Sequence, residues 1–290
     1  NITYGGVKWC RRSGIIMMHG FSKAFSQSIK EEADKCKLKS PLISIIMPAY
    51  NLSKSIAHSI DVVKRVMEIH GFNYEIIVVD DGSVDSTFRV AIRKHCNPHV
   101  RVYRLPKNMG KGFALIYGFK KSRGDLVAFF DGDLDIDPRQ IVLLINALRR
   151  VKADAVVTSK WHTQSRTKAS FTRRFLSKSF YALAKVLLGV KVSDTQTGAK
   201  IFRRQVLEEV AHCLVIKRYA FDVELLTAIA TRGYRIIEVP AIWGIKLNSR
   251  FKIKEAIRML IDLLAITYRH KVKKQYSVFF RDKVTLSQLF

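Results

Sequence analysis

The 290-residue chain has little cysteine, little acidic charge and no long apolar run. Its four cysteines lie far apart and form no Cys-x-x-Cys pair, which disfavours a zinc site or a disulfide scaffold and fits a reducing, cytoplasmic compartment. The longest stretch without Lys, Arg, Asp or Glu runs from residue 40 to residue 53 and contains two prolines. A membrane-spanning helix needs about 20 apolar residues, so we expect no such helix, and we find no secretion signal.

The shortage of acidic residues leaves 51 Lys and Arg against 24 Asp and Glu, a formal charge of +27. Such an excess predicts a polyanionic partner, which is a nucleic acid, an acidic membrane surface or a phosphorylated substrate. Hydrophobic residues make up 48% of the chain, enough to bury a sizeable core, so a wholly disordered protein is excluded.

Apolar runs alternate with helical periodicity along most of the chain. This rhythm is typical of an α/β protein with a doubly wound, mostly parallel sheet, in which ligands bind beyond the carboxyl ends of the strands. We predict strands at 42–47, 75–79, 100–103, 125–130, 153–158, 199–202 and 235–239. We predict helices at 53–70, 84–95, 111–122, 138–150, 171–188, 203–213, 220–232 and 252–270.

The patterning divides the chain into a basic N-terminal extension (1–40), the region of alternating strands and helices (41–245) and a basic C-terminal segment (246–290). The helix predicted in the last part has a dense apolar face with basic residues around it. This pattern fits a helix that lies in a membrane interface, and it fits equally a helix that packs on its own domain.

Three carboxylates follow the fourth predicted strand at alternate positions, Asp131, Asp133 and Asp135. In an extended loop, alternate side chains point to one side, so two or three of them could share one divalent cation. Oxygen ligands of this kind suit Mg²⁺ or Mn²⁺, whose remaining positions are filled by water and substrate phosphates. The alternative is a surface turn that uses Asp and Gly for its backbone geometry.

Two further polar clusters occur near strand ends or helix starts. Asp80-Asp81-Gly-Ser ends the second strand, where a carboxylate can accept hydrogen bonds from a base or ribose. Asn108-Met-Gly-Lys-Gly112 opens a helix, and its amides with Lys111 could hold a phosphate or sugar oxygen; the alternative is a simple glycine turn. A dinucleotide Gly-x-Gly-x-x-Gly motif and a P-loop are both missing from the sequence.

These motifs, together with Pro48-Ala-Tyr-Asn51, resemble in sequence and order those of family 2 glycosyltransferases with the GT-A fold, over roughly residues 41–245. Within that family, the runs 194–202 and 220–226 resemble the dolichyl- and polyprenyl-phosphate hexosyltransferases. The two runs favour the glucosyltransferase type, whereas Asp131-Gly-Asp-Leu-Asp135 is closer to the mannose synthase type.

The resemblance implies how the donor is bound. Asp80 and Asp81 would hold the nucleoside of a nucleotide sugar, in a pocket that is also lined by Pro48, Tyr50 and Asn51. Lys111 and Asp131 would bind the same nucleotide sugar. Asp131, Asp133 and Asp135 would reach Mg²⁺ or Mn²⁺, although family members often have Gln at the position of Asp135. Asp133, Lys200 and Asp222 would form the catalytic group. Many members place a catalytic carboxylate near Asp222 and Glu224, which here could instead position the sugar or brace Lys200 and Arg203.

The resemblance also implies a lipid-phosphate acceptor, gripped by Lys160, Arg173 and Ser177. Residues 139–190 contain eleven Lys or Arg and one acidic residue, which fits such an acceptor. A phosphate monoester is already anionic at neutral pH, so the reaction would invert the sugar without a dedicated base.

The leading hypothesis is therefore metal-dependent transfer of a hexose from a nucleotide sugar to dolichyl or polyprenyl phosphate, by a peripheral protein at the cytoplasmic face of an anionic membrane. UDP-glucose is the favoured donor and GDP-mannose the alternative. A transferase with a saccharide hydroxyl as acceptor is a second reading, and an inactive membrane scaffold a third. A basic nucleic-acid-binding protein is disfavoured because no nucleic-acid-binding motif is present.

Overall fold

The structure is a computed structural model, and contacts divide it into two units, 1–40 and 41–290. It describes residues 40–159, 182–189, 192, 194–218, 220–242 and 253–277, and four short strands in the first unit. The sequence did not predict these four strands, which pair as two antiparallel hairpins. They are β1 (Ile2–Tyr4) with β2 (Val7–Trp9) and β3 (Arg11–Arg12) with β4 (Ile15–Ile16).

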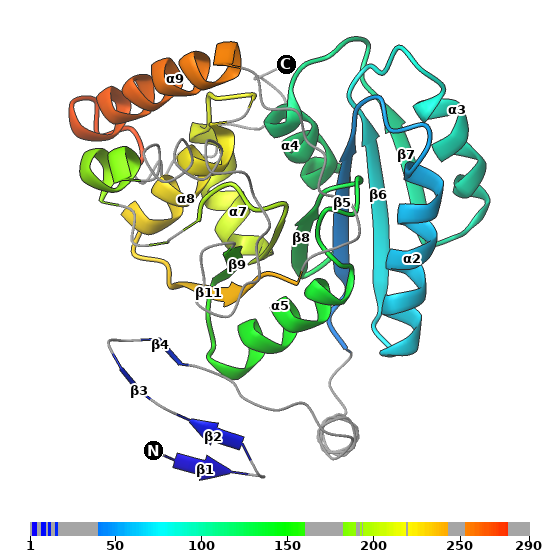
Figure 1. Ribbon diagram of the computed structural model, residues 1–290, viewed down its shortest axis with the longest axis horizontal. Coiled ribbons are helices and arrows are strands. Elements are labelled where there is room, and N and C mark those ends of the chain that lie inside the picture. The colour runs from blue at the N-terminus through cyan, green and yellow to red at the C-terminus, as the bar shows by residue number, and fades with distance from the viewer. Residues whose placement is uncertain are drawn as a thin grey trace. The chain divides into compact units, whose positions relative to one another are not determined.

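The second unit contains, in its described residues, a seven-stranded sheet of order β11-β9-β10-β8-β5-β6-β7 (Figure 1). All of these strands run parallel except β10, which is antiparallel to both of its neighbours, β8 and β9. The prediction of a doubly wound, mostly parallel sheet is confirmed, and each predicted strand lies within two residues of its observed bounds. The strands are β5 (Ile43–Ala49), β6 (Tyr74–Asp80), β7 (Val100–Arg104), β8 (Leu126–Phe130), β9 (Ala155–Ser159), β10 (Ala199–Arg203) and β11 (Ile236–Pro240).

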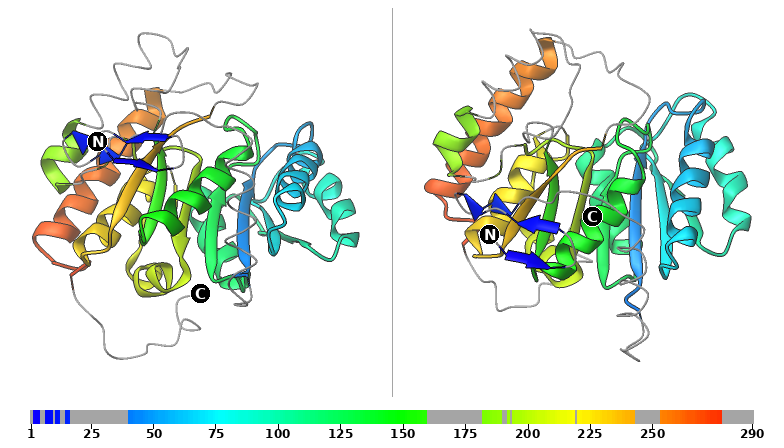
Figure 2. Two further views of the ribbon diagram at one scale, coloured as in Figure 1. Left: turned by 90° about the horizontal axis from the view of Figure 1, so that it is seen from below. Right: turned by 60° about the horizontal axis from the view of Figure 1, so that its bottom comes forward.

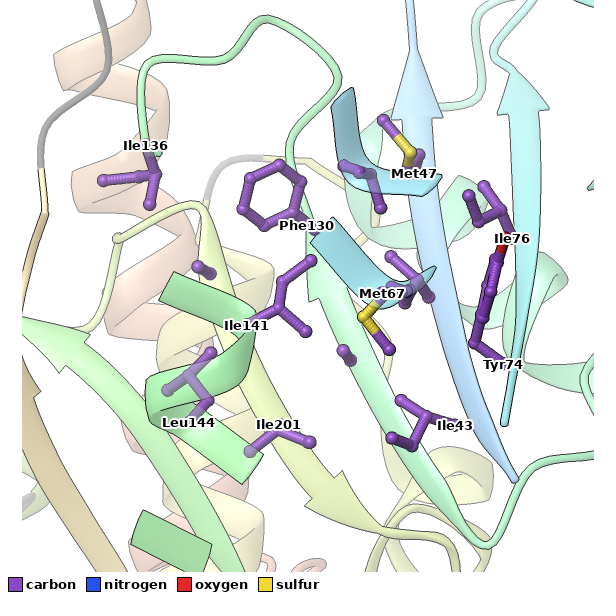
Figure 3. Close-up of a cluster of buried hydrophobic side chains, with 14 of the residues drawn as sticks. Ile43, Met47, Met67, Tyr74, Ile76, Phe130, Ile136, Ile141, Leu144 and Ile201 are labelled. Carbon is purple, nitrogen blue, oxygen red and sulfur yellow. The ribbon is translucent and has the colours of Figure 1, made fainter. Parts of the chain in front are cut away.

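Helices cover both faces of this sheet, which explains why β6 and β8 are buried at every position. On one face, α2 and α5 pack over the strands, and Figure 3 shows part of that core, with Met67 and Ile141 above Ile43 and Ile201. On the other face, α4, α7 and α8 form a second core around Phe129. The helices are α2 (Ile56–Ile69), α3 (Thr87–Ile92), α4 (Lys111–Lys121), α5 (Arg139–Arg150), α7 (Arg204–Val210), α8 (Phe221–Thr231) and α9 (Ile253–Lys271).

The C-terminal helix α9 packs against its own domain (Figure 2). Leu263 and Ile266 are completely buried in the same core as α8, and Tyr276, just beyond the helix, is buried with them. A second apolar row on α9 is exposed and consists of Ile257, Leu260, Ile261, Leu264 and Tyr268. The helix therefore has two apolar faces, and among the residues that the structure describes only one of them is covered. Among the described helices, none is both long and apolar enough to cross a membrane.

Candidate functional site

The polar residues singled out in the sequence gather at one edge of the sheet. The carboxyl ends of the parallel strands β5, β6 and β8 meet there, at Ala49, Asp80 and Phe130. Because β10 runs antiparallel to β8, its first residues reach the same edge, and Ala199 pairs with Phe130. The strand directions therefore bring Lys200 close to the Asp131 region, although about 70 residues separate them.

Lys111 and Asp131 form an ion pair at the centre of this edge. The Lys111 ammonium lies 2.7 Å from one carboxylate oxygen of Asp131 and 2.8 Å from the other. Burial disfavours the charged form of Lys111, but Asp131, Asp222 and Asp133 outweigh it and raise its pKa. The lysine is therefore a fixed positive charge beside the first carboxylate of the Asp-x-Asp motif.

Gly198 fixes the position of Asp131 from the other side. Its carbonyl accepts the Asp131 backbone N–H (3.0 Å), and a Cβ at this glycine would collide with the Asp131 carboxylate. A glycine is thus required at position 198 if Asp131 is to keep this orientation.

Asp133 and Asp135 follow in a tight turn in which Leu134 has a positive φ of 60°. The backbone N–H of Asp135 donates to an Asp133 carboxylate oxygen (3.1 Å). Burial and the negative charge of Asp131 raise the pKa of Asp133. Within the described residues, no group of three or more acidic, histidine or cysteine side chains is placed to hold a metal ion. The expected three-carboxylate set is therefore not assembled here, because the Leu134 turn interrupts the extended alternation that the prediction assumed.

Asp80 and Asp81 are both buried at the end of β6. One Asp80 oxygen accepts the Ser83 backbone N–H (3.3 Å), and the other lies 3.3 Å from Arg104 Nε. The two Asp81 oxygens accept the backbone N–H groups of Met109 (2.7 Å) and Gly110 (2.9 Å). Burial raises the pKa of Asp81 despite these two donors. In this structure Asp81 braces the Asn108–Gly112 segment.

The loop after β5 is tied to the same region. Asn51 has a φ of 54°, its backbone N–H donates to Ser83 Oγ (2.9 Å), and its side-chain oxygen accepts the Val84 backbone N–H (3.1 Å). Pro48 is partly buried, whereas Tyr50 beside it is 45% exposed. Tyr50 and Asn51 are therefore both exposed, whereas Pro48, the third residue expected on the nucleoside side, is partly buried.

Four backbone amides in and next to the Asn108–Gly112 motif make hydrogen bonds within the protein. Those of Met109 and Gly110 are bound by Asp81, and those of Gly112 and Phe113 donate to the Lys217 carbonyl at 2.8 and 3.3 Å. These four amides are therefore already bonded within the protein and do not point at a phosphate in this structure. The Lys111 side chain is the group of this motif that faces the site.

Lys200 and Asp222 form a buried ion pair with a separation of 2.8 Å, and their side chains are only 2% and 7% exposed. The Lys200 ammonium also donates to the Thr197 carbonyl (2.6 Å). Asp222 thus braces Lys200, one of the two alternatives read from the sequence. Arg203 instead donates to the Ala153 carbonyl (3.0 Å).

Glu224 does not face the site. Its side chain is completely buried and accepts hydrogen bonds from Val215, Ile216, Arg269 and Tyr276. The family resemblance put Asp222 and Glu224 where many members have a catalytic carboxylate. The sequence could not predict the Glu224 network, because its partners lie up to 52 residues away. The expected acceptor residues Lys160, Arg173 and Ser177 lie outside the described residues.

Solved structures with a similar arrangement of elements include two synthases of glycosyl-3-phosphoglycerates. Glucosyl-3-phosphoglycerate synthase from Mycobacterium tuberculosis superposes with a TM-score of 0.64, covering 86% of this chain and 85% of that one at 21% identity. Mannosyl-3-phosphoglycerate synthase from Rubrobacter xylanophilus gives a TM-score of 0.62 over 88% and 79% of the two chains, at 16% identity. At these identities the likeness shows the fold, which is the GT-A fold of glycosyltransferases.

Sequence comparison is more specific. The family model described as glycosyl transferase family 2 matches residues 44–211. The dolichyl-phosphate beta-glucosyltransferase ALG5C of Trichomonas vaginalis is 35% identical over 237 residues, covering 77% of this chain and 70% of that protein. The human dolichyl-phosphate beta-glucosyltransferase is 32% identical over 244 residues, covering 79% and 75%. The chain belongs to glycosyltransferase family 2, and it is a glycosyltransferase.

Proposed function

We propose that this enzyme transfers glucose from UDP-glucose to the phosphate of a dolichyl or other polyprenyl phosphate, with inversion at the anomeric carbon. The relatives that match most of the chain are named dolichyl-phosphate beta-glucosyltransferases. The structural observation that supports the proposal is that both carboxylates on α8, Asp222 and Glu224, are bound to partners within the protein.

Neither of these carboxylates is placed to act as a general base. Asp222 is held by Lys200, and Glu224 is fully buried among four donors. A hydroxyl acceptor needs a base to remove its proton, whereas a phosphate monoester carries about −1.5 to −2 charge at neutral pH and can attack directly. The engagement of both groups therefore favours a phosphate acceptor over a saccharide hydroxyl.

A divalent cation fits the donor side. Asp131 and Asp133 are partly buried carboxylates whose mutual repulsion contributes to the raised pKa of Asp133, and a cation between them would relieve it. Mg²⁺ and Mn²⁺ are commonly held by one or two carboxylates and the phosphates of a substrate. The M. tuberculosis synthase was solved with Mn²⁺ and UDP-glucose. Asp131 and Asp133 would hold the metal, which would supply positive charge to the departing nucleoside diphosphate.

The remaining groups bind and orient the substrates. Asp80 and Asp81 would lie on the nucleoside side, with Tyr50 as an exposed ring beside the base. Lys111 would balance the charge of the diphosphate, since its pKa is raised and it remains an ammonium at neutral pH. Lys200, held in place by Asp222, would direct its positive charge at the reacting phosphates. Lys160, Arg173 and Ser177 would bind the acceptor phosphate.

The acceptor is carried by a membrane, and α9 is the surface that we assign to it. The exposed row from Ile257 to Tyr268 is apolar, and the exposed basic residues Lys271, Lys273 and Lys274 follow at its end. Such a helix binds an anionic surface through both apolar burial and charge. We infer that the enzyme acts as a peripheral protein at the cytoplasmic face of the membrane.

The test is an assay of the purified protein with labelled UDP-glucose, Mn²⁺ and either dolichyl phosphate or dolichol. We expect a labelled lipid product only with the phosphate. Equal transfer to dolichol or to a saccharide acceptor would overturn the proposed acceptor, and no product with either UDP-glucose or GDP-mannose would overturn the proposed function. A product with GDP-mannose alone would change the donor and keep the acceptor. Anomeric configuration, measured by NMR of the product, tests inversion.

A further inference from the structure

Glu224 joins three parts of the chain that are far apart in sequence. One carboxylate oxygen accepts the backbone N–H groups of Val215 (2.9 Å) and Ile216 (2.7 Å). The other accepts the hydroxyl of Tyr276 (2.6 Å) and Nη2 of Arg269 (3.2 Å). The carboxylate thus ties α8 to the segment before it and to the end of α9.

The donors around Glu224 satisfy a carboxylate that would otherwise be costly to bury. Arg269 supplies the balancing charge, and its Nε also donates to the Tyr276 hydroxyl (3.2 Å). Gln275 adds a bond to the Cys213 carbonyl (2.9 Å) in the same region. Because hydrogen bonds to a buried charge are stronger than neutral ones, this network fixes the 213–216 segment firmly.

The residue that follows this segment, Lys217, contacts the start of α4. The Lys217 carbonyl accepts the backbone N–H groups of Gly112 (2.8 Å) and Phe113 (3.3 Å). These amides belong to the first turn of α4, which no side chain caps. A Cβ on Gly110 would collide with the Lys217 carbonyl, so the two backbones are in close contact. Lys111 lies between Gly110 and Gly112 in the sequence, and its ammonium forms the ion pair with Asp131.

We propose that Glu224 is a positioning residue for donor binding. Through the segment from Val215 to Lys217 it holds the first turn of α4, and thereby the Lys111–Asp131 pair, while Arg269 and Tyr276 of the C-terminal segment orient Glu224. This rests on the proposed function in one respect, the assignment of Lys111 and Asp131 to the donor diphosphate.

Three variants test the proposal. Tyr276→Phe removes one hydroxyl from the network and keeps the ring, and Glu224→Gln replaces two acceptor oxygens with one. The control is Tyr74→Phe, since Tyr74 is also a buried tyrosine whose hydroxyl donates to a glutamate, Glu68 at 3.3 Å, but at the opposite end of β6 from the site. Thermal unfolding of all three shows how far each change destabilises the fold.

The first measurement is hydrogen exchange in peptides that cover the start of α4. Tyr276→Phe and Glu224→Gln should speed exchange of the Gly112 and Phe113 amides about tenfold, and Tyr74→Phe should leave it unchanged. Unchanged exchange at these amides in both network variants overturns the proposal, whatever the enzyme's substrate.

The second measurement is calorimetric titration with UDP, and with GDP, in the presence of Mn²⁺. The network variants should weaken binding of the nucleotide that the wild type prefers about tenfold, and Tyr74→Phe should match the wild type. Equal losses in Tyr276→Phe and Tyr74→Phe would mean a purely structural role and would overturn the proposal. If the wild type binds neither nucleotide, the proposed function fails, and hydrogen exchange still decides whether Glu224 holds the start of α4.

Discussion

The Lys200 ammonium lies 2.8 Å from the Asp222 carboxylate, and both side chains are almost completely buried. Removal of one partner of such a pair leaves an uncompensated buried charge and lowers the free energy of unfolding by about 3–5 kcal/mol. Asp222→Ala should therefore lower the free energy of unfolding by about 3 kcal/mol, as measured by urea denaturation.

A double variant separates stability from activity at this pair. Lys200→Met with Asp222→Leu should recover most of the lost stability, because apolar residues often replace a buried ion pair at little cost. The same variant should remain inactive in glucosyl transfer if the Lys200 charge acts on the reacting phosphates. An active double variant would remove Lys200 from the proposed mechanism.

We expect Lys111 to contribute chiefly to binding of the nucleotide-sugar donor. Lys111→Met removes the positive charge beside Asp131, so we expect UDP to bind about tenfold more weakly, as one charge-assisted contact is lost. Lys111→Arg keeps the charge and should lose less. UDP affinity equal to that of the wild type in Lys111→Met would contradict the donor role.

Gly110 and Gly233 both have positive φ, 104° and 79°, but only Gly110 has neighbours where a Cβ would stand. Alanine at either position should destabilise the fold by about 1–2 kcal/mol, because an L side chain strains this backbone conformation. Gly110→Ala should in addition raise KM for the nucleotide sugar, since its Cβ pushes against the Lys217 carbonyl. The same KM in both variants would show that contact with Lys217 is unimportant.

Stability should fall in acid partly through Glu75. Burial raises the pKa of this carboxyl, but hydrogen bonds from Ser44 and Arg123 and the charge of Arg101 outweigh it, so the pKa lies below 4.5. A carboxyl whose pKa is lower in the folded state than in the unfolded state stabilises the fold at pH values above its unfolded-state pKa. This stabilisation is lost as the pH falls through the folded-state pKa. Urea denaturation between pH 6 and about 3 should show a shallower loss for Glu75→Gln than for the wild type. Parallel curves would rule out this contribution.

The exposed row of α9 can be tested with vesicles. Leu260→Gln with Leu264→Gln should weaken co-sedimentation with vesicles that contain an anionic lipid about tenfold or more, since each buried leucine contributes on the order of 1 kcal/mol. Ile69→Gln is the matched control, because Ile69 is exposed on α2, outside this row. Equal binding by all three proteins would exclude α9 as the membrane-contacting surface.

Much of the fold could be predicted because it depends on local patterns. The run Ile43–Met47 is apolar at every position except Ser44, and a strand that is covered on both faces can bury such a run. Helices such as α5 repeat their apolar residues every three or four positions. The Asp-rich strand ends could also be found, because parallel strands place their carboxyl ends at one edge.

The sequence by itself thus determined the fold class, the order of the strands in the seven-stranded sheet along the chain and the edge of the sheet where the site lies. The tertiary structure alone decided the antiparallel direction of β10, which brings Lys200 to that edge, and the assignment of Asp81, Asp222 and Glu224 to partners within the protein. The physical reason is that strand direction and the partner of a buried charge depend on which distant segments meet. These long-range contacts depend on packing over the whole domain, and the spacing of residues along the sequence does not predict them.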